Sequence, residues 1–160
     1  MNPKLDQARL EYKNGYYAKK LEQGLEFQDV VTRALYRRGI VVIGHASRRF
    51  QNSHGENMLG AEIKRDGKFR ETGNLYIETS EKSHPDNPTY VPSGIYRADN
   101  SWLYVIGDEK EIWIFSVKYL RLLSKRFHVV EKPTSIGFLL PIEEANKYSI
   151  RQIDLRKQHG

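Results

Sequence analysis

The clearest periodic pattern of apolar residues lies near the amino end of the chain and predicts an α-helix. Within residues 25–38 the apolar side chains recur at the spacing of one helical face, and Gly39 follows as a suitable residue to end the helix. The stretch before it, residues 5–20, is charged and tyrosine-rich and also predicts a helix. Gly24 separates the two patterns, so we expect the helix to break there.

Alternation of apolar and polar residues predicts two β-hairpins farther along the chain. In the first, residues 60–66 and 74–78 alternate on either side of the connection GKFRETG, which has glycine at both ends. In the second, residues 102–106 and 111–115 flank the turn GDEKE. The other predicted elements are a short buried strand at 40–43, a helix at 117–127 capped by Ser116, a strand at 136–141 and a final helix at 143–149.

Two polar segments predict loops between these elements. Residues 45–57 show little periodicity, and residues 80–94 contain three of the six prolines. The order of helices and strands predicts an α/β fold with a mixed central β-sheet flanked by helices. We expect a single domain over residues 1–160, with an N-terminal helical extension at 1–24 and a core at 26–125.

Composition excludes several classes of protein. The chain has no cysteine, which excludes disulfide scaffolds, thiol nucleophiles and cysteine-ligated metal sites. No apolar run is long enough to cross a membrane, and the first residues lack the apolar stretch of a signal peptide. We therefore expect no membrane partner and a cytoplasmic location. Lysine plus arginine number 26 against 20 aspartates and glutamates, a moderate bias that favours polyanionic partners.

The candidate chemistry lies on the polar face of the first predicted hairpin. In the expected register, Glu62 lies opposite Glu78, and Lys64 and Asp66 follow on the same face. Glu56 precedes the first strand and is close enough in sequence to bend over that face. Like charges opposite each other destabilise a sheet, and a divalent cation would relieve the repulsion. Mg²⁺ needs only one or two carboxylates plus substrate phosphate. The other interpretation is an ordinary solvated hairpin face.

The segment GENMLGAEIKRD resembles the PD-(D/E)xK nuclease superfamily, which includes many restriction endonucleases. Glu62, Ile63 and Lys64 form a literal E-x-K. The segment LGAEIK is similar to the corresponding strand of mismatch-repair nicking endonucleases, and residues 55–82 with 93–102 are similar to small phage and bacterial nucleases. The resemblance covers residues 26–125. It implies a restriction-endonuclease-like fold and Mg²⁺-dependent hydrolysis of DNA, with Mn²⁺ as a substitute metal.

The resemblance admits two assignments of the metal-binding acids. In the first, Glu56 and Glu62 bind the metal and Lys64 is the signature lysine. In the second, Asp66 and Glu78 bind it, and Lys64 or Lys82 replaces the lysine that is missing at Ser80. Both assignments share Glu62, Lys64 and Glu78 as their centre. Either implies that a metal-activated water attacks the phosphodiester while Lys64 positions that water.

The basic residues around this motif are candidates for contacts with the DNA backbone. They are Arg48, Arg49, Arg65, Lys68 and Arg70. The other interpretation is a solvated basic surface. The resulting hypothesis is a small Mg²⁺-dependent DNA endonuclease of a bacterium or phage, with a homodimer expected if it cuts both strands. The alternatives are a catalytically inactive nucleic-acid-binding module on the same fold and a non-enzymatic protein-interaction domain.

Overall fold

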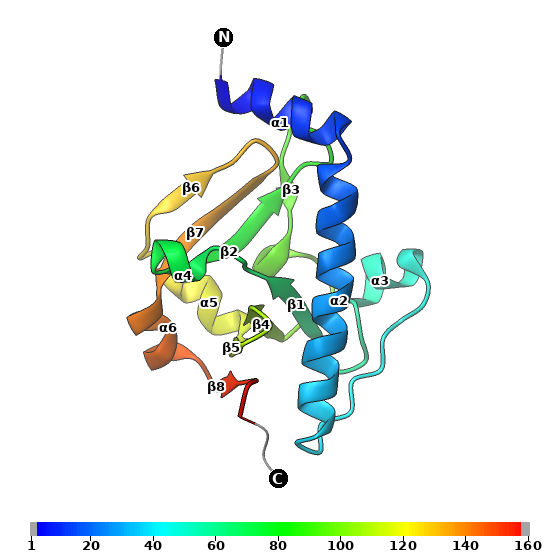
Figure 1. The fold of residues 1–160 in the computed structure, drawn as a ribbon, viewed down its shortest axis with the longest axis vertical. Coiled ribbons are helices and arrows are strands. Elements are labelled where there is room, and N and C mark those ends of the chain that lie inside the picture. The colour runs from blue at the N-terminus through cyan, green and yellow to red at the C-terminus, as the bar shows by residue number, and fades with distance from the viewer. Residues whose placement is uncertain (1–2, 158–160) are drawn as a thin grey trace.

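The computed structural model describes residues 3–157 and has an α/β fold with two separate four-stranded sheets (Figure 1). The helices are α1 (Pro3–Lys13), α2 (Tyr16–Tyr36), α3 (Arg48–His54), α4 (Phe69–Thr72), the 3₁₀ helix η1 (Gly94–Tyr96), α5 (Val117–Leu123) and α6 (Ile142–Tyr148). The strands are β1 (Ala61–Arg65), β2 (Asn74–Glu81), β3 (Val91–Pro92), β4 (Leu103–Gly107), β5 (Glu111–Ser116), β6 (Val129–Glu131), β7 (Ser135–Pro141) and β8 (Arg151–Asp154).

The first sheet has the order β1-β4-β5-β8 and is covered on both faces. On one face, Val105 and Ile112 pack in a core that includes the buried side of α2. On the other face, Tyr104 and Trp113 belong to a second core, which the first sheet shares with β2 and β7. Strands buried on both faces are apolar at nearly every position, which explains the continuous apolar runs of β4 and β5. Their predicted hairpin is confirmed.

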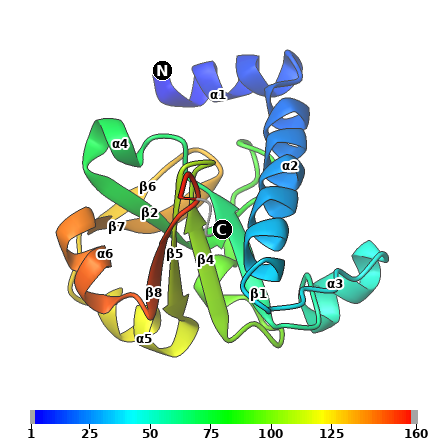
Figure 2. The same ribbon diagram turned by 60° about the horizontal axis from the view of Figure 1, so that its bottom comes forward.

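The second sheet has the order β3-β2-β7-β6 and is antiparallel throughout. Leu75 and Ile77 of β2 pack with Phe138 of β7 in the core that also contains Trp113. Helices α5 and α6 complete this core through buried residues such as Leu120, and Figure 2 shows both helices beside the two sheets. The second core therefore joins the two sheets, whereas the first core attaches α2.

The predicted hairpin of residues 60–66 and 74–78 is wrong, because its two strands belong to different sheets. Strand β1 runs parallel to β4, with Glu62 beside Tyr104. Strand β2 is antiparallel to β7, with Glu78 beside Gly137. Alternation defines which residues share a face of a strand, but it does not define which strand lies alongside. For the same reason the prediction of one mixed central sheet is wrong, whereas the α/β class is confirmed.

The helices at the amino end also differ from the prediction. Helix α2 continues through Gly24, and the break lies at Gly15, which has a left-handed φ of 71°. An isolated glycine inside a helix costs only about 1 kcal/mol, which the apolar contacts of α2 outweigh. The buried face predicted for residues 25–38 is confirmed by the burial of Phe27, Val31 and Leu35.

Three shorter segments also differ from the prediction. Residues 40–43 are not a strand, and within residues 3–157 this region has only the isolated bridge between Gly44 and Asn57. Residues 45–57, predicted as a loop, contain α3. Ser116 caps α5 as predicted, but that helix ends at Leu123.

Among the described helices, none combines the length and apolar composition that crossing a membrane requires.

Substitutions on α2 test whether this helix is held by its buried face. Leu35 is 2% exposed and Leu25 is 55% exposed. We expect Leu35→Ala to lower the free energy of unfolding by about 2–5 kcal/mol, because it leaves a cavity against the first sheet. The control Leu25→Ala should change it by less than about 0.5 kcal/mol. Urea unfolding followed by circular dichroism measures both; equal effects would contradict this packing.

Candidate functional site

Glu62, Lys64 and Glu78 lie together where the two sheets meet. Alternation along β1 places Ala61 and Ile63 in the core under α2, so Glu62 and Lys64 point to the opposite face. The Lys64 Nζ lies 2.9 Å from Glu62 Oε1 and 3.8 Å from Glu78 Oε1. The three side chains are therefore neighbours as predicted, but packing between sheets brings them together, not a hairpin.

The carboxylate of Glu62 is buried and balanced by two cations. Its side chain is 1% exposed, and within the part of the chain that the structure describes only the Lys64 ammonium lies within hydrogen-bond distance of the carboxylate, at Oε1. Lys64 forms the close ion pair, and Arg97 Nη1 lies 3.7 Å from Glu62 Oε2. Burial lowers the pKa of Lys64, but the Glu62 and Glu78 carboxylates outweigh that effect and raise it above its ordinary value. Lys64 is therefore a permanent positive charge.

The segment around η1 supplies Arg97, which the sequence did not identify. Arg97 also lies 3.5 Å from Glu81 Oε1, and the Ser93 hydroxyl donates a 2.8 Å hydrogen bond to Glu78 Oε1. Gly94 has a φ of 52°, and a Cβ there would come within 2.2 Å of the carbonyl oxygen of Glu78. Glycine therefore lets this segment pack directly on β2. The proline-rich composition predicted the loop, but no local pattern marks Arg97 as a partner of Glu62.

Glu56 joins the cluster through Glu62. It lies between α3 and β1, and its Oε2 accepts hydrogen bonds of 3.4 Å from the Ile63 amide and from Gln28 Nε2. Burial, and then the charge of Glu62, raise the pKa of Glu56 from 4.5 to about 7. Glu56 therefore holds its proton more tightly than a solvent-exposed glutamate does.

Asp66 lies at the end of β1 and lines a cleft together with Lys64 and Glu78. The cleft has a volume of about 350 Å³. Asp66 Oδ2 accepts a 2.9 Å hydrogen bond from the Tyr76 amide, and Oδ1 accepts another from the Lys68 amide. Asp66 therefore ties the end of β1 to β2, and both of its oxygens already have partners.

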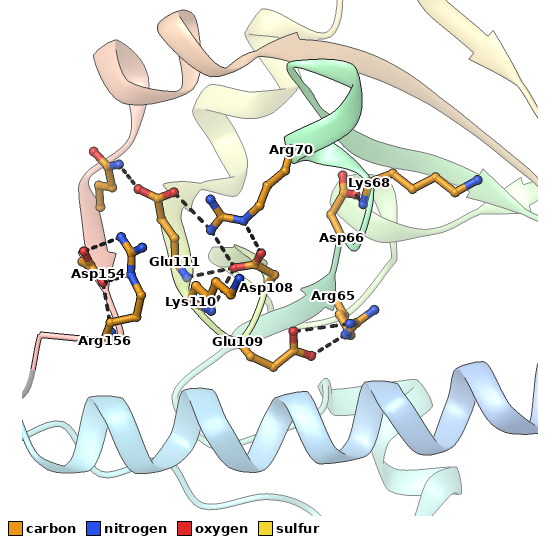
Figure 3. Close-up of polar contacts among 11 residues, drawn as sticks. Arg65, Asp66, Lys68, Arg70, Asp108, Glu109, Lys110, Glu111, Asp154 and Arg156 are labelled. Atoms are coloured by element: carbon orange, nitrogen blue, oxygen red, sulfur yellow. Dashed lines mark hydrogen bonds and ion pairs between the residues drawn. The ribbon is translucent and has the colours of Figure 1, made fainter.

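The basic residues predicted to contact DNA do not form one surface. Arg65 pairs with Glu109 at 2.6 Å, and Arg70 donates hydrogen bonds of 2.6 and 3.0 Å to Asp108 (Figure 3). Lys68 is exposed and lines the cleft. Arg48 and Arg49 are exposed on α3, which lies on the other side of α2 from α4 (Figures 1 and 2). Of this set, only Arg65 and Lys68 line the cleft, and Arg65 is already paired.

Glu62 and Glu78 have the chemistry of magnesium ligands, and the Lys64 ammonium lies between their carboxylates. Within residues 3–157, no group of three or more histidine, aspartate and glutamate side chains is arranged to hold a metal. Glu62 Oε1 contacts the Lys64 ammonium, Glu62 Oε2 accepts no hydrogen bond from a described residue, and Glu78 lies on the other side of Lys64. Two carboxylates are enough for Mg²⁺, whose other ligands are waters and phosphate oxygens. The charges that balance Glu62 in this structure belong to Lys64 and Arg97.

Comparisons with known proteins found no match for this chain: it matches no protein-family model, no curated protein and no solved structure.

The raised pKa of Glu56 predicts a dependence of stability on pH. The folded protein binds this proton more tightly than the unfolded chain, so Glu56 stabilises the fold below pH 4.5, and this contribution is lost as pH rises through about 7. We expect Glu56→Gln to be more stable than the parent at pH 8 by up to about 3 kcal/mol, and equally stable near pH 4.5.

Urea unfolding between pH 4.5 and pH 8 measures this difference. Glu22→Gln, at an exposed position of α2, is the control and should not change the profile. A constant difference between Glu56→Gln and the parent across this range would show that the Glu56 carboxyl is not destabilised when it ionises.

Proposed function

We propose that this chain is a Mg²⁺-dependent DNA endonuclease whose active site is the group Glu62, Lys64 and Glu78. The observation that carries the proposal is the buried carboxylate of Glu62, ion-paired to a lysine at a cleft that other lysines line. The E-x-K of Glu62 and Lys64 is the part of the chain that resembles the PD-(D/E)xK superfamily. A restriction-endonuclease-like arrangement of the core belongs to the same proposal.

The carboxylates would hold the metal. Glu62 and Glu78 are the proposed ligands, and Glu56 or Asp66 would complete the set. When bound, Mg²⁺ polarises the phosphate and lowers the pKa of a bound water, and Mn²⁺ can substitute for it. Glu56 Oε2 accepts a hydrogen bond from the amide of Ile63, the residue next to Glu62. Glu56 therefore holds β1 in position as well as adding a carboxyl group to the site.

Lys64 acts as a positive charge and not as a base. Its raised pKa keeps the ammonium protonated at neutral pH. The ammonium is held between Glu62 and Glu78 at the cleft, where it can contact a phosphate oxygen. A fixed positive charge in a partly buried site stabilises the negative charge that develops on the phosphate during attack. Arg97 holds Glu62 from the other side and so keeps the carboxylate in place.

The partner and setting follow from the same proposal. The protein would act on DNA in the cytoplasm of a bacterium, encoded by the host or by a phage. A two-fold homodimer would supply two active sites if both strands of a duplex are cut.

A catalytically inactive nucleic-acid-binding module is the second candidate. The observation that favours it is the balance of charge around Glu62, because Lys64 and Arg97 already neutralise this acid without a metal. In that case the cluster joins the two sheets, and the cleft binds nucleic acid without cutting it. A non-enzymatic protein-interaction domain would bind no nucleic acid at all.

Cleavage assays separate these candidates. Supercoiled plasmid and circular single-stranded DNA are incubated with the protein in Mg²⁺, in Ca²⁺ and with a chelator. We expect nicked or linear product only with Mg²⁺ or Mn²⁺. Glu62→Gln should lower the cleavage rate by about 100-fold or more, since it removes a metal ligand and leaves the cleft intact. Binding to DNA, measured with a chelator present, should survive.

Removing Lys64 alone leaves Glu62 buried without its closest partner, which destabilises a protein by about 3–5 kcal/mol. The double variant Glu62→Gln with Lys64→Met removes both charges and should fold. Lys118→Ala, at an exposed position of α5, is the matched control for loss of a lysine. Full cleavage by the double variant would overturn the proposed active site, and DNA binding without cleavage in any metal would favour the inactive module.

A further inference from the structure

Three lysines from separate parts of the chain line the cleft beside Lys64. Lys20 comes from α2, Lys68 immediately precedes α4, and Lys132 lies between β6 and β7. None of the three forms a salt bridge with a described residue. This distinguishes them from Arg65 and Arg70, whose charges are already paired. We call the cleft with these three residues the lysine cleft.

The positive charges of the lysine cleft are close enough to disturb each other. Lys132 Nζ lies 3.2 Å from the centre of the Tyr76 ring, which holds the ammonium against the wall of the cleft. Burial lowers the pKa of Lys132, and the charge of Lys68 lowers it further, while Asp66 and Glu78 act in the opposite direction. Lys68 and Lys132 place two positive charges on the wall of the same cleft, which suits it to a phosphate.

The cleft is small, and the acid that pairs with its Lys64 is buried. Its volume of about 350 Å³ is at the small end of the range for ligand pockets, enough for about one nucleotide. The Lys64 side chain is 29% exposed, and the Glu62 side chain behind it is 1% exposed. A phosphate can reach these groups only if its strand enters the cleft. The paired strand of a duplex would prevent that entry.

Helix α1 runs between α2 and the region of Lys132. At Gly15 it joins α2, which carries Lys20 of the cleft. Its first turn lines a neighbouring hollow together with Lys132. Arg9 pairs with Asp86 at 2.6 Å and fixes the helix to the loop that follows β2. Figure 1 shows α1 crossing the top of the molecule from α2 towards β3. Helix α1 therefore lies beside the lysine cleft.

We propose that the lysine cleft binds the phosphate backbone of single-stranded DNA, with Lys20, Lys68 and Lys132 contacting phosphates and leading the strand to Lys64. The proposed binding of single-stranded DNA rests on the lysines and the size of the cleft alone. The consequence for catalysis, cleavage of single-stranded DNA or of unpaired segments in preference to duplex, rests on the proposed endonuclease function.

Binding measurements without metal test the cleft independently of cleavage. The probes are a fluorescent oligothymidylate of about 15 nucleotides and a blunt duplex of equal length, titrated with the full chain in a chelator. We expect the single strand to bind at least 10-fold more tightly than the duplex. The double variant Lys68→Ala with Lys132→Ala should weaken single-strand binding about 10-fold or more. Its slope of log affinity against log salt should fall by about 1.4, or 0.7 for each phosphate contact.

Lys118→Ala is the matched control and should bind like the parent. Because the substituted lysines are at least partly exposed, we expect every variant to fold. Thermal unfolding checks this for each of them. Duplex binding as tight as that of the single strand would overturn the preference for single strands. Unchanged affinity and salt slope in the double variant would overturn the cleft as the binding site. Lysine-dependent binding without cleavage in Mg²⁺ would leave this inference standing and overturn only the endonuclease.

Discussion

The ion pair between Lys64 and the buried Glu62 is the interaction on which the rest of the site depends. A carboxylate that is 1% exposed is stable only with a cation beside it, and Lys64 and Arg97 provide that charge from different segments of the chain. Glu78 adds a second acid from the other sheet. Lys64 and Glu78 therefore link the two sheets electrostatically, and with Glu62 they are the groups on which the proposed metal-assisted phosphate chemistry depends.

The surrounding fold explains why this pair stays in place. Strand β1 has α2 on one face, so its even-numbered positions must point toward β2. Gly94 allows the segment that carries Arg97 to press against the backbone of Glu78. Asp66 accepts a hydrogen bond from the Tyr76 amide, which fixes the end of β1 to β2. These contacts pack the two sheets together around Lys64, and Lys64 itself lines the lysine cleft.

Charge is distributed around the molecule in two different ways. Near the turn between β4 and β5, cations such as Arg65 and Arg70 are matched with Glu109 and Asp108, which makes that region a structural network (Figure 3). In the lysine cleft, Lys68 and Lys132 are cations without such partners among the described residues. Net charge alone does not distinguish these cases, because only the unmatched cations attract an external anion.

The sequence by itself determined the α/β class, the faces of the strands and the identity of the central acids and lysine, because alternation and helical periodicity are local properties of the chain. It placed Glu62, Lys64 and Glu78 together through a hairpin that does not exist. Only the tertiary structure decided that β1 and β2 lie in different sheets, since strand pairing is a choice among distant segments. It alone brought in Arg97, Lys20 and Lys132, which meet the site through packing between elements and carry no local signal.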